Sequence, residues 1–305
     1  MKNTLKKILL IGKTLTLLCK SLIFRIIAGS DISGKEFDSY GRILSFKFLV
    51  KGDFSRFITL LANPVSIVRY FEFPFALAAI NCKLGNLCLD VSSPRLFLLY
   101  LLHKYPDLYL EIVNPDINDL NETAVYLKAL GNSVSVNLSS HDVIKLPYPD
   151  NYFDAITSIS VIEHISDMGD SLAMKEMWRV LKPGGKLVIT VPCSKYHYEE
   201  WRDEDVYGLG NQPKNNKYFF QRFYDTNTIK CRLYDSIGIE PSVIEIFGEK
   251  QPGKFIEYEK RWLKFGIEET IKDPWYIVKD YKYFTAIDVL PGIGVCGLVF
   301  EKKGD

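Results

Sequence analysis

The sequence predicts an α/β protein with a doubly wound, mostly parallel sheet of seven strands and helices on both faces. Short apolar runs of strand character alternate with helical segments between residues 87 and 192. Strands that are joined through helices pair in parallel, and the helices then cover both faces of the sheet. The length of 305 residues, with 47% hydrophobic and 25% charged residues, suits one large globular domain with insertions.

The individual elements follow from the local apolar pattern, taken in chain order. A strand at 86–91 runs into a turn formed by Ser92, Ser93 and Pro94. The pattern then predicts a helix at 94–105, a strand at 108–114, a helix at 121–131, strands at 133–140 and 153–160, a helix at 170–181 and a strand at 186–192. A helix at 226–238 and strands at 242–248 and 292–303 complete the predicted order of elements.

Two segments interrupt this alternation with aromatic and charged residues, at about 193–224 and 249–284. One sheet with two insertions explains the pattern better than two independent domains. The chain therefore divides into a basic amphipathic helix at 1–28, a helical N-terminal cap at 29–80 and a sheet domain at 81–305.

The N-terminal helix carries basic residues and no acidic one: Lys2, Lys6, Lys7, Lys13, Lys20 and Arg25. At about 100° per residue, the basic side chains from Lys6 onward fall on one side of the helix. The apolar side chains fall on the other: Leu5, Ile8, Leu15, Leu22, Ile23 and Ile26. No uncharged apolar run reaches the roughly 18 residues of a membrane span. The helix either lies in a membrane interface or packs on the domain with its lysines in water, and both interpretations stay open.

The net charge and the cysteines exclude several classes of protein. A formal charge of +1 argues against nucleic acid as the partner. The six cysteines are scattered, without a CxxC pair or a histidine at ligand spacing, so we expect neither a metal site nor a disulfide framework. Reduced cysteines within apolar runs are typical of a cytoplasmic protein.

Acidic residues close successive strands of the pattern. Asp90 ends the first strand, Asp116 follows the second and Asp142 follows the third. The fourth strand leads into residues 160–164. Because ligands of open parallel sheets bind beyond the carboxyl ends of the strands, these positions predict a binding site.

Two longer motifs make this prediction specific. The runs LPYPDNYFDAITSISVIEHI and EMWRVLKPGGKLVITVP resemble the class I S-adenosylmethionine-dependent methyltransferases, in the type 11 branch. The resemblance covers residues 86–192 well and the flanks weakly. It implies a Rossmann-like fold, S-adenosyl-L-methionine as the cofactor, and methyl transfer as the reaction.

The resemblance also assigns roles to particular residues. Asp90 matches the acid that organises the turn around the methionine end of the cofactor. Asp116 matches the acid that accepts hydrogen bonds from both ribose hydroxyls, a task suited to a fixed carboxylate. Asp142 matches the acceptor for the adenine amine, with Val143 beside the ring, and Ser160 completes the cofactor set after the fourth strand.

The turn after the first strand departs from the family pattern. Glycine is usual there because it allows positive φ and close approach of the backbone to the ligand. This chain has Ser92 and Ser93, whose hydroxyls or amides could contact the methionine carboxylate. We expect a rebuilt turn that still binds cofactor; a turn that has lost this role is the alternative.

Glu163 and His164 are the candidate catalytic residues. They stand in the loop after the fourth strand, and the pKa range of histidine suits a general base. A base is needed only if the acceptor must lose a proton, because orientation and exclusion of water supply much of the catalysis of methyl transfer. The sequence EHI is also common in this branch whatever the acceptor, so a purely structural role stays open.

The first insertion supplies the candidate substrate-binding residues, which are Tyr198, Trp201, Arg202, Gln221 and Arg222. Aromatic side chains beside polar groups could line an acceptor pocket, close over the cofactor or simply pack.

We therefore expect methyl transfer from S-adenosylmethionine to a small or membrane-proximal acceptor, with oxygen favoured over other atoms. The acceptor would be a small molecule or a glycan-linked or lipid-linked group, handled in the cytoplasm or at the inner face of the membrane. Two alternatives remain, since function resides in the site and not in the fold. One is a non-catalytic scaffold with a degenerate turn, and the other is an enzyme of the same fold with different chemistry.

Overall fold

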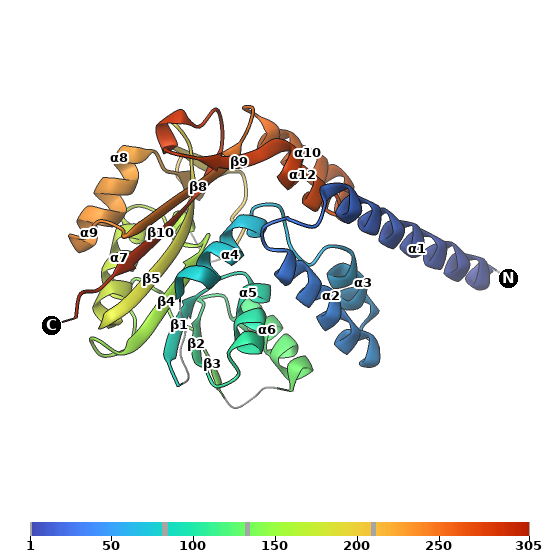
Figure 1. Ribbon diagram of the computed structural model, residues 1–305, viewed down its shortest axis with the longest axis horizontal. Helices are drawn as coiled ribbons and strands as arrows, with labels where there is room; N and C mark the ends of the chain where they lie inside the picture. The colour runs from blue at the N-terminus through green and yellow to red at the C-terminus, as the bar shows by residue number, and fades with distance from the viewer. Residues whose placement is uncertain (1, 81–84, 132–134, 209–211, 305) are drawn as a thin grey trace.

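A twisted sheet of eight strands forms the centre of the computed structural model (Figure 1), with the order β3-β2-β1-β4-β5-β10-β8-β9. The structure describes residues 2–80, 85–131, 135–208 and 212–304, and side chains of the first helix from residue 12 onward. Five strands are parallel: β1 (Leu87–Val91), β2 (Tyr109–Val113), β3 (Val136–Ser139), β4 (Phe153–Ile159) and β5 (Leu181–Cys193). The predicted Rossmann-like, mostly parallel fold is confirmed.

Helices connect β1 to β2, β2 to β3 and β4 to β5, whereas residues 140–152 join β3 to β4 without a helix. These helices are α5 (Arg95–Lys104), α6 (Ile117–Leu130), η1 (Ile162–His164) and α7 (Gly169–Val180). Strand order reverses at β1, because β2 and β3 lie on one side of it and β4 and β5 on the other. The carboxyl ends of these strands therefore share one edge, and a switch point of this kind is where ligands of such sheets bind.

The antiparallel end of the sheet has one strand more than the sequence analysis predicts. β10 (Gly294–Glu301) lies antiparallel between β5 and β8 (Val243–Glu249), and β9 (Tyr281–Phe284) pairs with β8 at the edge. The prediction of seven strands is wrong because β9 belongs to the second insertion. Its pairing depends on aromatic packing: the Phe247 ring lies 5.9 Å from Tyr281 and 5.2 Å from Tyr283.

Alternating strand residues feed two cores, one on each face of the sheet. Cys88, Ala155 and Val188 point to the face covered by α2, α5 and α6. Leu89, Ile156 and Leu187, one residue away in each case, point to the face covered by α7. Since successive side chains of a strand alternate between faces, both faces of the sheet are buried, as a doubly wound fold requires.

Four helices precede the sheet. They are α1 (Lys2–Ala28), α2 (Lys35–Val50), α3 (Phe54–Ala62) and α4 (Arg69–Ile80). α4 lies on the sheet so closely that a Cβ on Gly297 of β10 would come within 2.6 Å of the Phe75 ring. The division of the chain into segments 1–28, 29–80 and 81–305 stays a prediction.

α1 projects from the body, and its C-terminal half packs against α3 and α12 (Figure 1). The Ser21 hydroxyl donates to the Ala62 carbonyl at 2.6 Å, and the Phe24 ring lies 6.0 Å from that of Trp275. Arg25 forms an ion pair with Asp38 at 2.6 Å and so faces the protein, unlike a side chain of a solvated basic face. The side chains of Lys2, Leu5, Lys6, Lys7 and Ile8 lie outside the described residues.

The two predicted insertions are folded. The first contains the hairpin β6 (Tyr198–Arg202) and β7 (Tyr218–Phe223), and the second contains α10 (Lys254–Phe265), α11 (Ile267–Thr270), α12 (Asp273–Asp280) and β9. The remaining elements are α8 (Thr226–Ile229), η2 (Lys230–Tyr234), α9 (Asp235–Ile237) and η3 (Ile287–Val289). Among the described residues, no helix has both the length and the apolar character needed to cross a membrane.

Candidate active site

The turn after β1 is organised around Asp90. This carboxyl is fully buried, and it accepts hydrogen bonds from the Ser93 amide at 2.9 Å and the Thr157 hydroxyl at 2.5 Å. Burial raises the pKa of Asp90 to about 6, against the opposing effect of these hydrogen bonds. Asp90 therefore links the turn to the neighbouring strand β4, which is a positioning role.

Ser92 adopts the backbone conformation that favours glycine, with φ of 52°. Its amide and its hydroxyl both donate to the Val113 carbonyl at 3.0 Å. The Ser93 hydroxyl accepts from the Ile159 amide at 3.1 Å. The expected direct contact of these groups with a methionine carboxylate finds no support in this arrangement, because they already bond to protein groups and shape the turn.

Asp116 and Asp142 follow the neighbouring strands β2 and β3 at the same edge of the sheet. Asp116 is the N-cap of α6, where one carboxylate oxygen accepts from the Asn118 amide at 2.8 Å. Asp142 accepts from the Ile144 amide at 3.1 Å, and Val143 beside it is buried. In the described part of the chain, each carboxylate keeps one oxygen without a hydrogen-bond partner, so each is free to accept from a ligand.

Ser160 ends β4 and contacts a residue that the sequence analysis does not select. Its hydroxyl donates to Glu72 of α4, as does the hydroxyl of Thr190 from β5 at 2.8 Å. Glu72 is fully buried and forms an ion pair with Arg69 one turn earlier in α4. The N-terminal cap therefore contributes a carboxylate and a guanidinium to the carboxyl edge of the sheet.

Glu163 is buried beside this cluster. Burial raises the pKa of its carboxyl to about 8, and the charge of Glu72 adds to the rise. One oxygen of Glu163 has no hydrogen-bond partner among the described residues. A carboxyl with this pKa is mostly protonated at neutral pH, so Glu163 can donate a hydrogen bond but is not an anionic base there.

His164 is neutral at physiological pH because burial lowers its pKa to about 4. Its Nδ1 lies 2.7 Å from the Phe220 carbonyl oxygen, which can only accept, so Nδ1 carries the proton. Nε2 is then the acceptor, and the Tyr207 hydroxyl lies 3.1 Å from it. The hydrogen bonds thus assign the tautomer and place Tyr207 of the first insertion at the basic nitrogen.

The β6–β7 hairpin brings several of the predicted substrate-binding residues together next to η1. Tyr198 stacks on Phe223 at 4.4 Å, and Trp201 lies 5.5 Å from the ring of Phe219. Arg202 pairs with Glu200 at 2.8 Å and Glu259 at 2.9 Å, and Gln221 donates to Glu200 at 2.7 Å. These contacts stabilise the hairpin; a role in acceptor binding stays a prediction.

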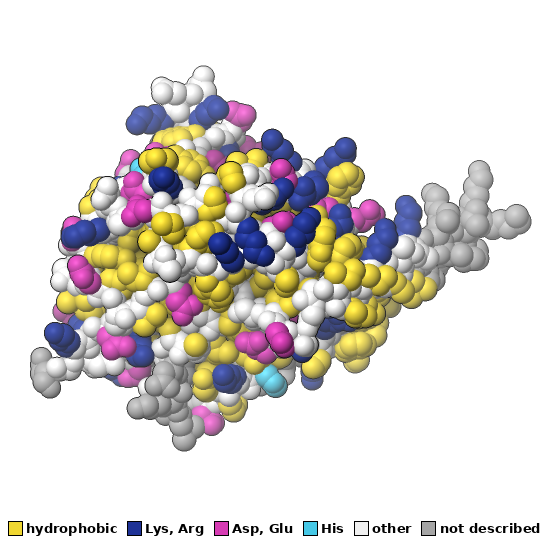
Figure 2. Space-filling view, turned by 45° about the horizontal axis from the view of Figure 1, so that its top comes forward, with side chains coloured by type: hydrophobic (Ala, Val, Ile, Leu, Met, Phe, Trp, Pro, Cys, Tyr) yellow, Lys and Arg dark blue, Asp and Glu magenta, His cyan; other side chains and the backbone are white. Residues whose placement is uncertain are grey.

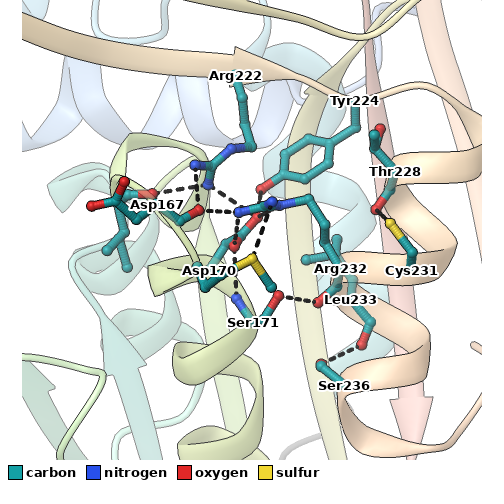
Figure 3. A network of polar contacts seen from close by, with 12 residues as sticks. Asp167, Asp170, Ser171, Arg222, Tyr224, Thr228, Cys231, Arg232, Leu233 and Ser236 are labelled. Carbon is teal, nitrogen blue, oxygen red and sulfur yellow. Dashed lines mark hydrogen bonds and ion pairs between the residues drawn. The ribbon is translucent and has the colours of Figure 1, made fainter. Parts of the chain in front are cut away.

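Arg222 is the exception, since its side chain is fully buried beside Asp170 (Figure 3). Its guanidinium pairs with Asp170 of α7 at 3.0 Å and donates to the Ile165 carbonyl at 2.8 Å. Asp170 also accepts from Tyr224 at 2.8 Å and pairs with Arg232 at 2.7 Å (Figure 3). Arg222 therefore joins the insertion to α7 through a buried charge network, and its predicted role in substrate binding stays a prediction.

Sequence reasoning missed Glu72, Arg69 and Tyr207. Arg69 and Glu72 precede the sheet in a helix whose apolar residues suggest only packing, and the partners of Glu72 at the strand ends are far away in the chain. Tyr207 has a weak signal, because it is one of several tyrosines in an aromatic insertion. Only the fold shows which of them meets His164.

Part of this chain is similar to a known protein family. The methyltransferase domain family matches residues 94–189, beginning just after the serine turn. A demethylmenaquinone methyltransferase of Deinococcus radiodurans is 39% identical over 79 residues, which are 26% of this chain and 32% of the relative. A ubiquinone/menaquinone biosynthesis C-methyltransferase UbiE of a Shewanella species is 37% identical over 109 residues, 34% of this chain and 41% of the relative.

The match thus spans between about a third and two fifths of the length of these curated relatives. Among solved structures, a geranyl diphosphate C-methyltransferase from Streptomyces coelicolor A3(2) is 13% identical, with 76% of each chain covered and a TM-score of 0.49. Residues 94–189 therefore match the methyltransferase domain family, which agrees with the resemblance of the sequence motifs to class I S-adenosylmethionine-dependent methyltransferases of the type 11 branch.

Proposed function

We propose that this protein transfers a methyl group from S-adenosylmethionine to a small organic acceptor. One observation supports this more than any other: Asp116 and Asp142 follow adjacent parallel strands beside the switch point, each with a carboxylate oxygen free for a ligand. A half-buried carboxylate fits the two hydroxyls of a ribose, and an exposed one beside buried Val143 fits an adenine edge. When bound, S-adenosylmethionine supplies an electrophilic methyl group.

The protein's part in such a reaction is to orient the acceptor and to handle its proton. With Glu163 protonated and His164 neutral but weakly basic, the site has no strong base at neutral pH. An acceptor with an acidic hydroxyl, such as a phenol or an enol, suits this environment. Tyr207 can relay the acceptor's proton to Nε2 of His164.

The acidic hydroxyl also bears on which atom is methylated. The anion of a phenol or enol can react through oxygen, which the sequence analysis favours, or through the neighbouring carbon, and the matched relatives are named as C-methyltransferases. We therefore propose one acceptor class with two possible products. Incubation with S-adenosylmethionine labelled with ¹³C in the methyl group, followed by NMR of the product, separates them because O-methyl and C-methyl carbons resonate far apart.

Cofactor binding is the first test. Titration calorimetry with S-adenosylmethionine and with S-adenosylhomocysteine should give a single site, and excess ligand should raise the melting temperature. If millimolar ligand gave no heat and no stabilisation, the result would favour the non-catalytic scaffold. The hydrogen bonds that Ser92 and Ser93 already make to protein groups are in keeping with that alternative.

We further propose that the protein works in the cytoplasm and contacts the inner face of the membrane through α1. Lys13 and Lys20 are exposed on one side of this helix, and Leu15, Leu22 and Ile26 are exposed on the other. Apolar and basic side chains together suit an anionic bilayer surface. Deleting residues 1–28 would be a poor test, because it leaves the buried Asp38 without Arg25. Sedimentation of the full-length chain with anionic and neutral vesicles is the direct measurement, and equal binding to both would contradict the proposal.

A further inference from the structure

An apolar groove of about 710 Å³ lies between α1 and α2. Its volume falls in the range of small-molecule sites, roughly 300–1,000 Å³. Figure 2 shows hydrophobic side chains gathered where α1 leaves the body, with lysine and arginine side chains beside them. The apolar lining comes from α1, α2, α3 and the α1–α2 turn: Leu22, Ile26, Ile32, Ile43, Phe46 and Leu61.

The lining is far more exposed than an apolar surface needs to be in a protein that is surrounded by water. Ile26 is 78% exposed, Ile43 71% and Phe46 52%. Scattered apolar residues are ordinary, but a contiguous apolar patch with a polar rim marks a binding surface. The same face continues along α1 through Leu15, and along α2 through Val50, which is 89% exposed.

The groove is also positively charged. Its lining contains three cations, Arg25, Lys35 and Arg42, and one acid, Asp38, which Arg25 already pairs. Arg42 is half-buried and makes no ion pair or side-chain hydrogen bond in the described part of the chain. Burial lowers the pKa of Arg42, and the charge of Arg25 lowers it further. An anion in the groove would relieve both effects.

We propose that this groove binds one anionic phospholipid of a bilayer, with an acyl chain between α1 and α2 and the phosphate against Arg42 and Lys35. The inference rests on the membrane contact proposed above and is independent of methyl transfer. The charge argues against a second copy of the chain as the occupant, since two positively charged grooves repel each other. The exposed apolar residues and lysines that continue along α1 favour a bilayer, which extends beyond the groove, over a free amphiphile.

A tryptophan at the centre of the groove reports on the acyl chain. In Phe46→Trp, phosphatidylglycerol with brominated acyl chains should quench the added emission, after subtraction of the wild-type signal. Leu172→Trp is the matched control, because Leu172 is 45% exposed on α7, on the other face of the sheet, and should show no added quenching. Brominated phosphatidylcholine should quench neither variant.

The charge is tested by Arg42→Gln, with Lys175→Gln on α7 as the control. Affinity for phosphatidylglycerol vesicles should fall about fivefold in the first variant and remain unchanged in the second. The double variant Ile43→Ser, Phe46→Ser should lose tenfold or more, since both side chains would otherwise be buried in the lipid. Far-UV circular dichroism and S-adenosylhomocysteine binding should be unchanged in all variants, which shows that they fold.

The outcomes separate the proposals. Sedimentation with anionic vesicles without quenching at position 46 would overturn the groove as a lipid site and leave the membrane contact of α1 standing. Absence of sedimentation would overturn both and leave methyl transfer, which calorimetry tests, untouched. A dimer that the double variant abolishes would overturn the lipid in favour of a second copy of the chain.

Discussion

Replacing Glu163 by Gln should flatten the decline of stability between about pH 6.5 and 8. Glu163 is buried where β4 meets η1, and burial raises the pKa of its carboxyl to about 8. Gln has nearly the same shape and does not titrate. The substitution therefore removes the proton uptake linked to this position while leaving the packing almost unchanged.

The sign and the size of the effect follow from linkage. A glutamate in the unfolded chain titrates near pH 4.5, so a raised pKa in the folded state stabilises the protein fully below that value. This stability is lost as the pH rises to about 8, at about 1.4 kcal/mol per pH unit. His164 acts in the opposite direction, because its pKa is lowered to about 4, and stability from it rises only up to about pH 6.5. Between pH 6.5 and 8 the carboxyl acts without this opposition, and its share of the decline is about 2 kcal/mol.

Urea unfolding of both proteins at several pH values in this window measures the difference directly. The free energy of unfolding of the wild type should fall by about 2 kcal/mol more than that of Glu163→Gln. Buried Asp273, whose pKa burial also raises, contributes to both curves and cancels in the comparison. Parallel curves would show that Glu163 is ionised in the folded protein, and the assignment of a neutral site would be wrong.

Three further predictions, each comparing two variants, test the site. Asp116→Ala should weaken S-adenosylhomocysteine binding by about 2–3 kcal/mol and destabilise the fold by about 1 kcal/mol, because Asp116 also caps α6. Asp116→Asn keeps the cap and should lose binding only; unchanged calorimetric affinity in it would mean another acid meets the ribose. Ser92→Ala should cost about 1 kcal/mol in urea unfolding, while Ser92→Gly should be nearly neutral since relief of positive φ offsets the lost hydrogen bond, and the reverse order would contradict this. Arg222→Met should cost about 3–5 kcal/mol and Arg202→Met under about 1 kcal/mol, and similar losses in both would refute the structural role of Arg222.

The parallel half of the sheet could be predicted from the sequence because its strands are buried on both faces. Near-continuous apolar runs such as 187–192, separated by amphipathic helices, favour buried parallel strands over other structures. Strand β9 could not be predicted in this way. Its sequence, Tyr281 to Phe284, is short and contains Lys282, and it becomes a strand only because Phe247 of β8 offers a surface for its rings.

The residues of the candidate active site also differ in how far the sequence predicts them. Asp90, Asp116 and Asp142 could be located because each follows a strand, and strand order alone brings strand ends together. Glu72 could not, since its contact with Ser160 joins residues 88 positions apart. The ion pair between Arg222 and Asp170 could not be predicted for a related reason, since nothing in the local sequence shows that these two residues meet.

Helix α4 contacts both the groove and the candidate active site. Substitutions are therefore informative only outside this helix. Tyr70 lines the groove and donates to Asp38 at 3.1 Å, while Glu72, two residues later, accepts from Ser160 and Thr190 at the strand ends. A change within α4 would disturb the groove and the site together, because a helix moves as a rigid unit. Arg42 and Phe46 lie on α2, and Asp116 and Glu163 lie beyond β2 and β4. A substitution at Arg42 or Phe46 should therefore change lipid binding alone, and one at Asp116 or Glu163 should change only the properties of the candidate active site.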